Sequence, residues 1–126
     1  MGQLLKYKFN PPVQKNNQDD HEYMVTDFIE ELRKVFKDGG YTTINNNEES
    51  AGTFLVGYKG VLYEVDSDYQ VGIPAFQYSA VGSGGPIALG SLFTSRGSPS
   101  DRILTSLEAA SHLNPYVRPP FHILKL

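Results

Sequence analysis

The chain has 126 residues, of which 40% are hydrophobic and 20% charged, as is typical of a soluble globular domain with a core of ordinary size. Its net charge of -3 gives no electrostatic reason to expect nucleic acid, and it has no apolar run long enough to span a membrane. The lack of cysteine excludes disulfides and thiol chemistry. We expect a single cytoplasmic domain over residues 1–126 that needs no cofactor.

Residues 1–20 are expected to be irregular, apart from a strand or a first helical turn before Pro11-Pro12. Residues 21–38 are predicted to form a helix, because apolar residues recur there at spacings of three and four. Asp19 or Asp20 can cap its start, and Gly39-Gly40 can end it. The predicted buried stripe of this helix comprises Val25, Phe28, Ile29, Leu32, Val35 and Phe36.

Residues 53–82 are predicted to contain the main strands. Two β-prone runs, 53–58 and 61–65, are joined at Lys59-Gly60 and indicate a hairpin. Asp66, Ser67 and Asp68 then turn the chain. Short strands are expected at 71–73 and at 76–81, and an earlier one within 41–50, followed there by a polar loop.

A glycine-rich turn leads from the last predicted strand into two helices over residues 86–113. Gly82, Gly84 and Gly85 allow backbone angles that other residues resist, and Pro86 suits a first helical position. Gly90 would let another element approach closely. The second helix begins at a capping box, Ser98-Pro99-Ser100-Asp101, and ends at Asn114-Pro115. Its predicted buried stripe is Ile103, Leu104, Leu107, Ala110 and Leu113, and residues 121–126 could form a closing strand.

The order of these features carries a resemblance. A hairpin at 54–65, a junction Gly82-Ser83-Gly84 and a helix at 98–112 together resemble the proteasome β-subunit family, which includes the peptidase subunit of the bacterial ATP-dependent two-component protease. The resemblance covers residues 50–113 best. It implies an α+β fold, namely part of the four-layer αββα sandwich of N-terminal-nucleophile hydrolases, with an antiparallel sheet and helices. It also implies a homo-oligomer, and an ATP-dependent unfoldase as a partner.

The resemblance further implies that the catalytic segment is absent. The family nucleophile is a mature N-terminal threonine whose own amine acts as the base, supported by an aspartate and a lysine in leading strands. The residues before the helix at 21–38 leave no room for those strands. We therefore expect a threonine-peptidase domain that is inactive alone and is completed by an N-terminal piece. The alternative is a non-catalytic assembly or binding protein that keeps the family core.

Ser83 is the supporting site candidate, because the resemblance places it beside the nucleophile's amino group. It could equally satisfy the backbone of its own turn. Gly82, Gly84 and Gly85 could bind an anion at the start of the helix. Thr42 is interpreted as a strand residue rather than a processed nucleophile, since it follows the long helix.

No metal site is expected. The three histidines, His21, His112 and His122, lack the spacing of metal ligands. The run Asp66-x-Asp68-x-Gln70 imitates the start of a calcium loop, but it lacks the glycine and the closing glutamate and is interpreted as a turn.

Overall fold

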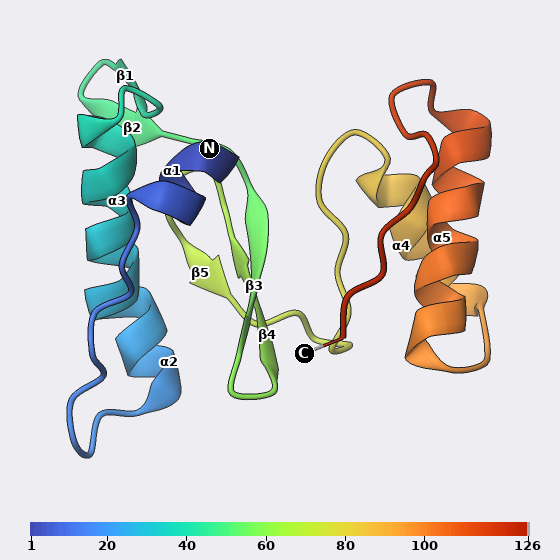
Figure 1. The fold of residues 1–126 in the computed structure, drawn as a ribbon, viewed down its shortest axis with the longest axis horizontal. Helices are drawn as coiled ribbons and strands as arrows, with labels where there is room; N and C mark the ends of the chain where they lie inside the picture. Colours follow the sequence, from blue (N-terminus) through green and yellow to red (C-terminus); the bar gives the residue numbers. More distant parts are fainter. Residues whose placement is uncertain (126) are drawn as a thin grey trace.

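The computed structural model describes residues 1–125, and Leu126 lies outside the described residues. Figure 1 shows three layers: a helical layer on one side, a sheet in the middle, and a pair of helices on the other side. The helices are α1 (Gly2–Tyr7), α2 (Asp20–Tyr23), the π-helical segment η1 (Met24–Phe28), α3 (Ile29–Asp38), α4 (Gly85–Thr94) and α5 (Pro99–Leu113). The strands are β1 (Thr43–Asn45), β2 (Glu48–Ser50), β3 (Phe54–Tyr58), β4 (Val61–Val65) and β5 (Val71–Gly72). This arrangement confirms the expected α+β class.

The first helical layer confirms the helix predicted at 21–38, with one addition. Asp19 caps it by accepting hydrogen bonds from the backbone N–H groups of His21 and Glu22. The helix then widens into a π turn over Met24–Phe28 before α3 continues as a regular α-helix. Its predicted stripe is buried at Phe28, Ile29, Leu32 and Phe36, whereas Val35 is half-buried and Val25 is exposed.

The central sheet is antiparallel, in the order β3-β4-β5. Lys59 and Gly60 have φ angles of 47° and 80°, so they form the two-residue turn that favours a right-twisted hairpin. One face of the sheet presents Phe54 and Val65 to α3 and Tyr63 to the segment α2–η1, and all three side chains are buried. A second hairpin, β1–β2, turns at Asn46 and Asn47, so the predicted polar loop after β1 contains an additional strand.

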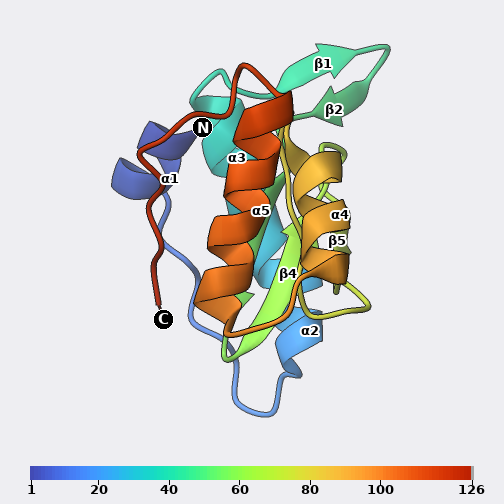
Figure 2. The ribbon, with the colours of Figure 1, turned by 90° about the vertical axis from the view of Figure 1, so that its right-hand side faces the viewer.

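The helix pair α4–α5 packs side by side on the far side of the sheet (Figures 1 and 2). Gly84 caps α4, Pro86 stands in its first turn, and Ser98 caps α5 by accepting a hydrogen bond from the Asp101 N–H. These starts were predicted from local sequence. The buried residues between the helices are mostly small: Gly85, Ala88, Leu92, Ser106 and Ala110.

Three sequence-based expectations are wrong. Residues 76–81 form no strand: Gln77 has a φ of 56°, and no strand of the described sheet pairs with this segment, which contacts β4 through the hydrogen bond from Ser79 to Glu64. The stretch 53–82 therefore holds strands only as far as Gly72. Residues 121–125 form no strand, and Leu126, the last residue of the predicted closing strand at 121–126, lies outside the described residues. Gly90 has open space where a Cβ would stand, so no described element approaches it closely.

The predicted buried stripe of α5 is also largely wrong. Ala110 is buried and Leu107 is half-buried, but Leu104 is 42% exposed and Leu113 69% exposed. Ile103 is 41% exposed. The apolar spacing of the helix is real, but part of this face borders an open space between α5 and the sheet instead of a packed layer.

Candidate functional site

An apolar cleft of about 500 Å³ lies between the sheet and the helix pair α4–α5. The sheet contributes Leu55 of β3, whose side chain points away from α3. The helices contribute one wall, and the glycine-rich turn at 82–85 contributes another. The lining residues are Leu55, Ser79, Ala80, Val81, Gly82, Ser83, Gly84, Gly85, Ala88, Leu92, Ile103, Ser106, Leu107, Ala110 and Val117.

Each glycine of the turn has its own structural reason. Gly82 has a φ of 97°, which an L side chain rarely adopts. A Cβ on Gly84 would stand 2.7 Å from Cγ2 of Val117 and 3.2 Å from Cβ of Ala110. A Cβ on Gly85 would stand 3.0 Å from the carbonyl oxygen of Ala80. The turn is thus closely packed, and the Gly85 N–H donates to the Gly82 carbonyl at 3.0 Å.

Ser83 is exposed and carries the only side-chain hydroxyl of the turn at 82–85. The other serines of the cleft are engaged: Ser79 donates to Glu64 Oε2 at 2.7 Å, and Ser106 donates to the Ile103 carbonyl at 2.7 Å. No Asp, Glu, His, Lys or Arg is among the residues that line the cleft. Ser83 therefore presents a hydroxyl with no side-chain base among the lining residues to activate it, whereas the hydroxyl of Ser79 is held by the Glu64 carboxylate.

The remaining sequence candidates lie away from the cleft. Thr42 is half-buried beside the core between α3 and the sheet, and its hydroxyl is 2.6 Å from that of Tyr69. His21 stacks on Tyr63 with ring centroids 6.4 Å apart, while His112 and His122 are exposed. Within residues 1–125, no group of three or more His, Asp or Glu side chains could hold a metal ion.

The Asp66–Gln70 segment is a turn. The Tyr69 N–H donates to the Asp66 carbonyl at 2.9 Å, and the Gln70 N–H donates to Asp68 Oδ1 at 3.0 Å. The Asp68 carboxylate therefore serves the backbone of this turn, as the sequence interpretation expected.

One contact near the cleft has no local sequence signal. Arg102 of α5 donates to the Leu92 carbonyl at the end of α4 at 2.6 Å, and its guanidinium lies 5.3 Å from the ring centre of Tyr78. Tyr78 in turn stacks on the exposed Phe76. Arg102 thereby ties the loop at 73–84 to both helices. The residues are ten and more apart in sequence, so periodicity could not pair them.

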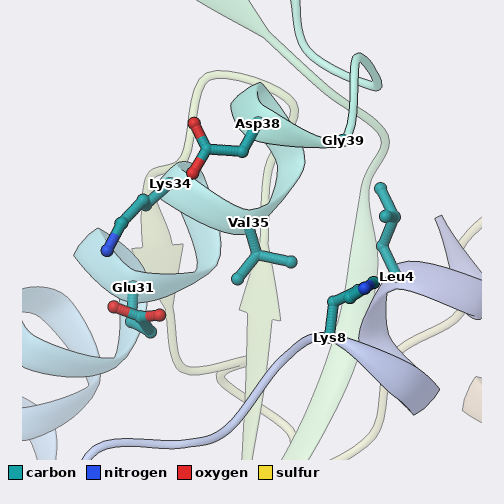
Figure 3. A pocket seen from close by; sticks show the side chains of 7 residues that line it. All are labelled: Leu4, Lys8, Glu31, Lys34, Val35, Asp38 and Gly39. Carbon is teal, nitrogen blue, oxygen red and sulfur yellow. The ribbon is translucent and has the colours of Figure 1, made fainter.

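A second hollow, of about 390 Å³, lies where α1 packs on α3. Figure 3 shows Leu4 of α1 and Lys8, which follows α1, on one side and Glu31, Lys34, Val35 and Asp38 of α3, with Gly39, on the other. The two apolar side chains lie between charged ones of both signs. The hollow combines no nucleophile with a base, so the cleft at the glycine turn is the stronger candidate.

The buried tyrosines Tyr23 and Tyr63 belong to the core between the first helical layer and the sheet rather than to a site. Burial raises the pKa of Tyr23 and of Tyr63, because it disfavours the charged phenolate. The Tyr23 hydroxyl donates to the Pro12 carbonyl at 2.7 Å and so pins the segment before α2. Both rings are fully packed, which leaves them no room for a substrate.

No protein-family model and no curated protein sequence matches the chain. Among solved structures, the fold is similar to one named "Thiobacillus denitrificans BPH", with a TM-score of 0.65 and 18% sequence identity. The match covers 94% of this chain and 62% of that chain, so these residues span less than two thirds of the similar structure. At this identity the likeness shows the fold alone. Within residues 1–125, no helix combines the length and apolarity needed to cross a membrane.

Proposed function

We propose that these residues form part of a proteasome-like N-terminal-nucleophile peptidase that is inactive until a segment outside the 126 residues supplies the nucleophile. The observation that carries the proposal is the cleft between the sheet and α4–α5, with the glycine turn in its wall and Ser83 exposed there. A four-layer sandwich would place its second sheet in such a space. The similar structure is longer than this chain, which is compatible with a further segment.

In this proposal Ser83 is a positioning residue. Its hydroxyl would hold the amine of an incoming N-terminal threonine, and that amine would be the base that the cleft lacks. The exposed hydroxyl, the positive φ of Gly82 and the close packing of Gly84 and Gly85 support this role, because a rigid turn fixes the oxygen. The chemistry itself would be acyl transfer to the threonine hydroxyl. Partner subunits and an ATP-dependent unfoldase belong to the same proposal.

The test compares the chain alone with the completed protein. The purified chain should neither cleave fluorogenic peptides nor react with reagents for N-terminal threonine. Co-expression with the polypeptide encoded directly upstream should create activity, and Ser83→Ala should lower it by up to about 100-fold. Thr105→Ala, on the exposed side of α5, is the matched control and should keep it. Turnover by the chain alone, or labelling at Thr42 or Ser83, would overturn the proposal.

A non-catalytic binding protein is the second candidate. It is favoured by one observation: none of the residues that line the cleft carries a titratable side chain. An apolar cleft with a few hydroxyls can bind an apolar segment without reacting with it. Completed protein that assembles fully but stays inactive, with and without Ser83→Ala, would favour this candidate.

A further inference from the structure

The outer edge of β3 is free to accept another strand. The order β3-β4-β5 leaves β3 with a neighbour on one side, and the described residues place no strand on the other. Because Lys59 and Gly60 form a two-residue turn, Tyr58 and Val61 exchange backbone hydrogen bonds, and so do Val56 and Tyr63. By alternation, the N–H and C=O groups of Leu55 and Gly57 point away from β4. Neither residue makes a backbone hydrogen bond to another segment of residues 1–125.

The other strand edges of the described residues are protected, in contrast to β3. Strand β5 has two residues and is soon followed by Pro74. Strands β1 and β2 have three residues each, and β2 carries Glu48 and Glu49. Strand β3 has five residues, Phe-Leu-Val-Gly-Tyr, with no charge and no proline. Such an edge is a ready template for pairing with another chain.

The sequence of β3 fits a second copy of itself. We propose that two copies of the chain pair antiparallel along β3, about a two-fold axis that passes beside Val56. This register sets Leu55 opposite Gly57 of the second copy and Phe54 opposite Tyr58 of the second copy. The outward groups of Leu55 and Gly57 then bond each other twice, once on each side of the axis. The proposal goes beyond the peptidase function and does not depend on it.

Side-chain packing supports the same register. Leu55 faces the cleft, and the residue opposite it would be glycine, which leaves room for the leucine side chain. On the other face, an aromatic pair would form at each end of the strand, an arrangement that stabilises antiparallel sheets. Since β3 contains no charged residue, pairing two copies of it places no like charges opposite each other. The result is a continuous sheet in the order β5-β4-β3-β3-β4-β5, with the α3 helices of both copies on one face.

The first experiment uses light scattering over a dilution series of the purified chain. We expect dimers that dissociate on dilution. Gly57→Pro removes the outward N–H but leaves the β3–β4 hydrogen bonds intact, because that N–H faces away from β4. The dimer dissociation constant should rise about tenfold or more, since each copy loses one intermolecular hydrogen bond. Gly57→Ala controls for the loss of glycine, and circular dichroism checks that both variants are folded.

The second experiment maps the register. The chain has no cysteine, so a single introduced thiol reports one contact. In the proposed register, residue 56 of one copy lies opposite residue 56 of the second copy in a non-hydrogen-bonded pair. The two Cα atoms would be about 4.5 Å apart, a distance that allows Val56→Cys to form a disulfide between the copies. The Val56→Cys variant should form a covalent dimer on mild oxidation, whereas Val71→Cys on β5 should not. A chain that stays monomeric at every concentration overturns the proposal. So does a dimer in which Val56→Cys fails to cross-link, since its contact would lie elsewhere.

Discussion

Residues 1–72 bury large side chains against one another, whereas the helix pair α4–α5 buries mainly small ones. The largest fully buried side chains, Tyr63, Phe36, Met24, Leu32 and Val65, all belong to the first region. In the helix pair the buried residues are Gly85, Ala88, Leu92, Ser106 and Ala110. Larger apolar side chains of that pair, such as Phe93, are left exposed.

The difference shows that the two regions obtain stability in different ways. The first region has a closed core, in which aromatic rings of α3 and β3 meet edge to face, as Phe36 and Phe54 do with centroids 6.1 Å apart. The helix pair is joined by close backbone approach at small residues and by the Arg102 contact to Leu92. One region is complete as a packing unit, and the other presents an apolar face to the cleft.

The largest expected effect comes from the closed core. Leu32 is fully buried between α3 and the sheet, so Leu32→Ala should lower the free energy of unfolding by about 2–5 kcal/mol. Leu104→Ala is the matched control on α5, where the side chain is 42% exposed, and should cost well under half as much. Urea denaturation of both variants measures the difference. Equal losses would mean that Leu104 is covered in solution.

The second-largest expected effect tests the close contact between Gly84, at the start of the helix pair α4–α5, and Val117. Gly84→Ala places a Cβ 2.7 Å from Cγ2 of Val117, so Val117 must move or the turn must open. Overpacking of this kind typically costs about 1–3 kcal/mol. Thermal unfolding should show a lower midpoint, and Val117→Ala in the same chain should recover part of the loss by making room. No recovery would show that Val117 is not the obstacle.

Local chemistry made much of the fold predictable. The β3–β4 hairpin, the Asp19 and Ser98 caps and the glycine turn each depend on residues within a few positions of one another. The sequence also singled out Gly82, Gly84 and Gly85, although it could not say which side chains approach them. Ser83 was placed correctly in a turn before a helix, but the role proposed for it stays untested.

Long-range packing accounts for the failures. The spacing of Ile103, Leu104 and Leu113 predicts an apolar face, but spacing carries no information on what covers that face. Residues 76–81 are β-prone, yet a strand needs a backbone-paired neighbour, and no strand of the described sheet pairs with this segment. The cleft itself was not predicted, because it arises from the separation of two layers whose residues are far apart in sequence.

A smaller effect, of opposite sign, comes from Gly90 in α4. A Cβ at this position meets no atom within 4 Å, and the residue has an ordinary helical setting. Gly90→Ala should therefore stabilise the chain by about 0.5–1 kcal/mol, because alanine loses less backbone freedom on folding. The measurement is the urea midpoint beside that of Gly84→Ala. Destabilisation would indicate that another segment or a second molecule packs against α4 at Gly90 in solution, so that this side of α4 is not open.

The smallest effect concerns pH and again separates the regions. Every ion pair of the described residues lies between Lys15 and Lys59, within the first region. A hydrogen bond from Lys37 lowers the pKa of Glu49, and a hydrogen bond from Lys59 lowers that of Asp20. A carboxyl whose pKa is lowered by folding stabilises the fold above its unfolded value. That contribution is lost as the pH falls through the lower, folded value.

Acid should therefore loosen the first region before the helix pair. The ordinary pKa values of Glu and Asp are 4.5 and 3.8, so the loss should develop below about pH 4.5. Amide hydrogen exchange resolved by residue can compare α3 with α5 as the pH is lowered. Glu49→Gln removes one of these carboxylates and should flatten the pH dependence in α3. High salt should weaken the effect, because each pair includes a side chain in contact with solvent and is therefore partly screened. If α5 exchanges faster than α3 as the pH falls, the packing of α5 is less stable to acid than the core around α3.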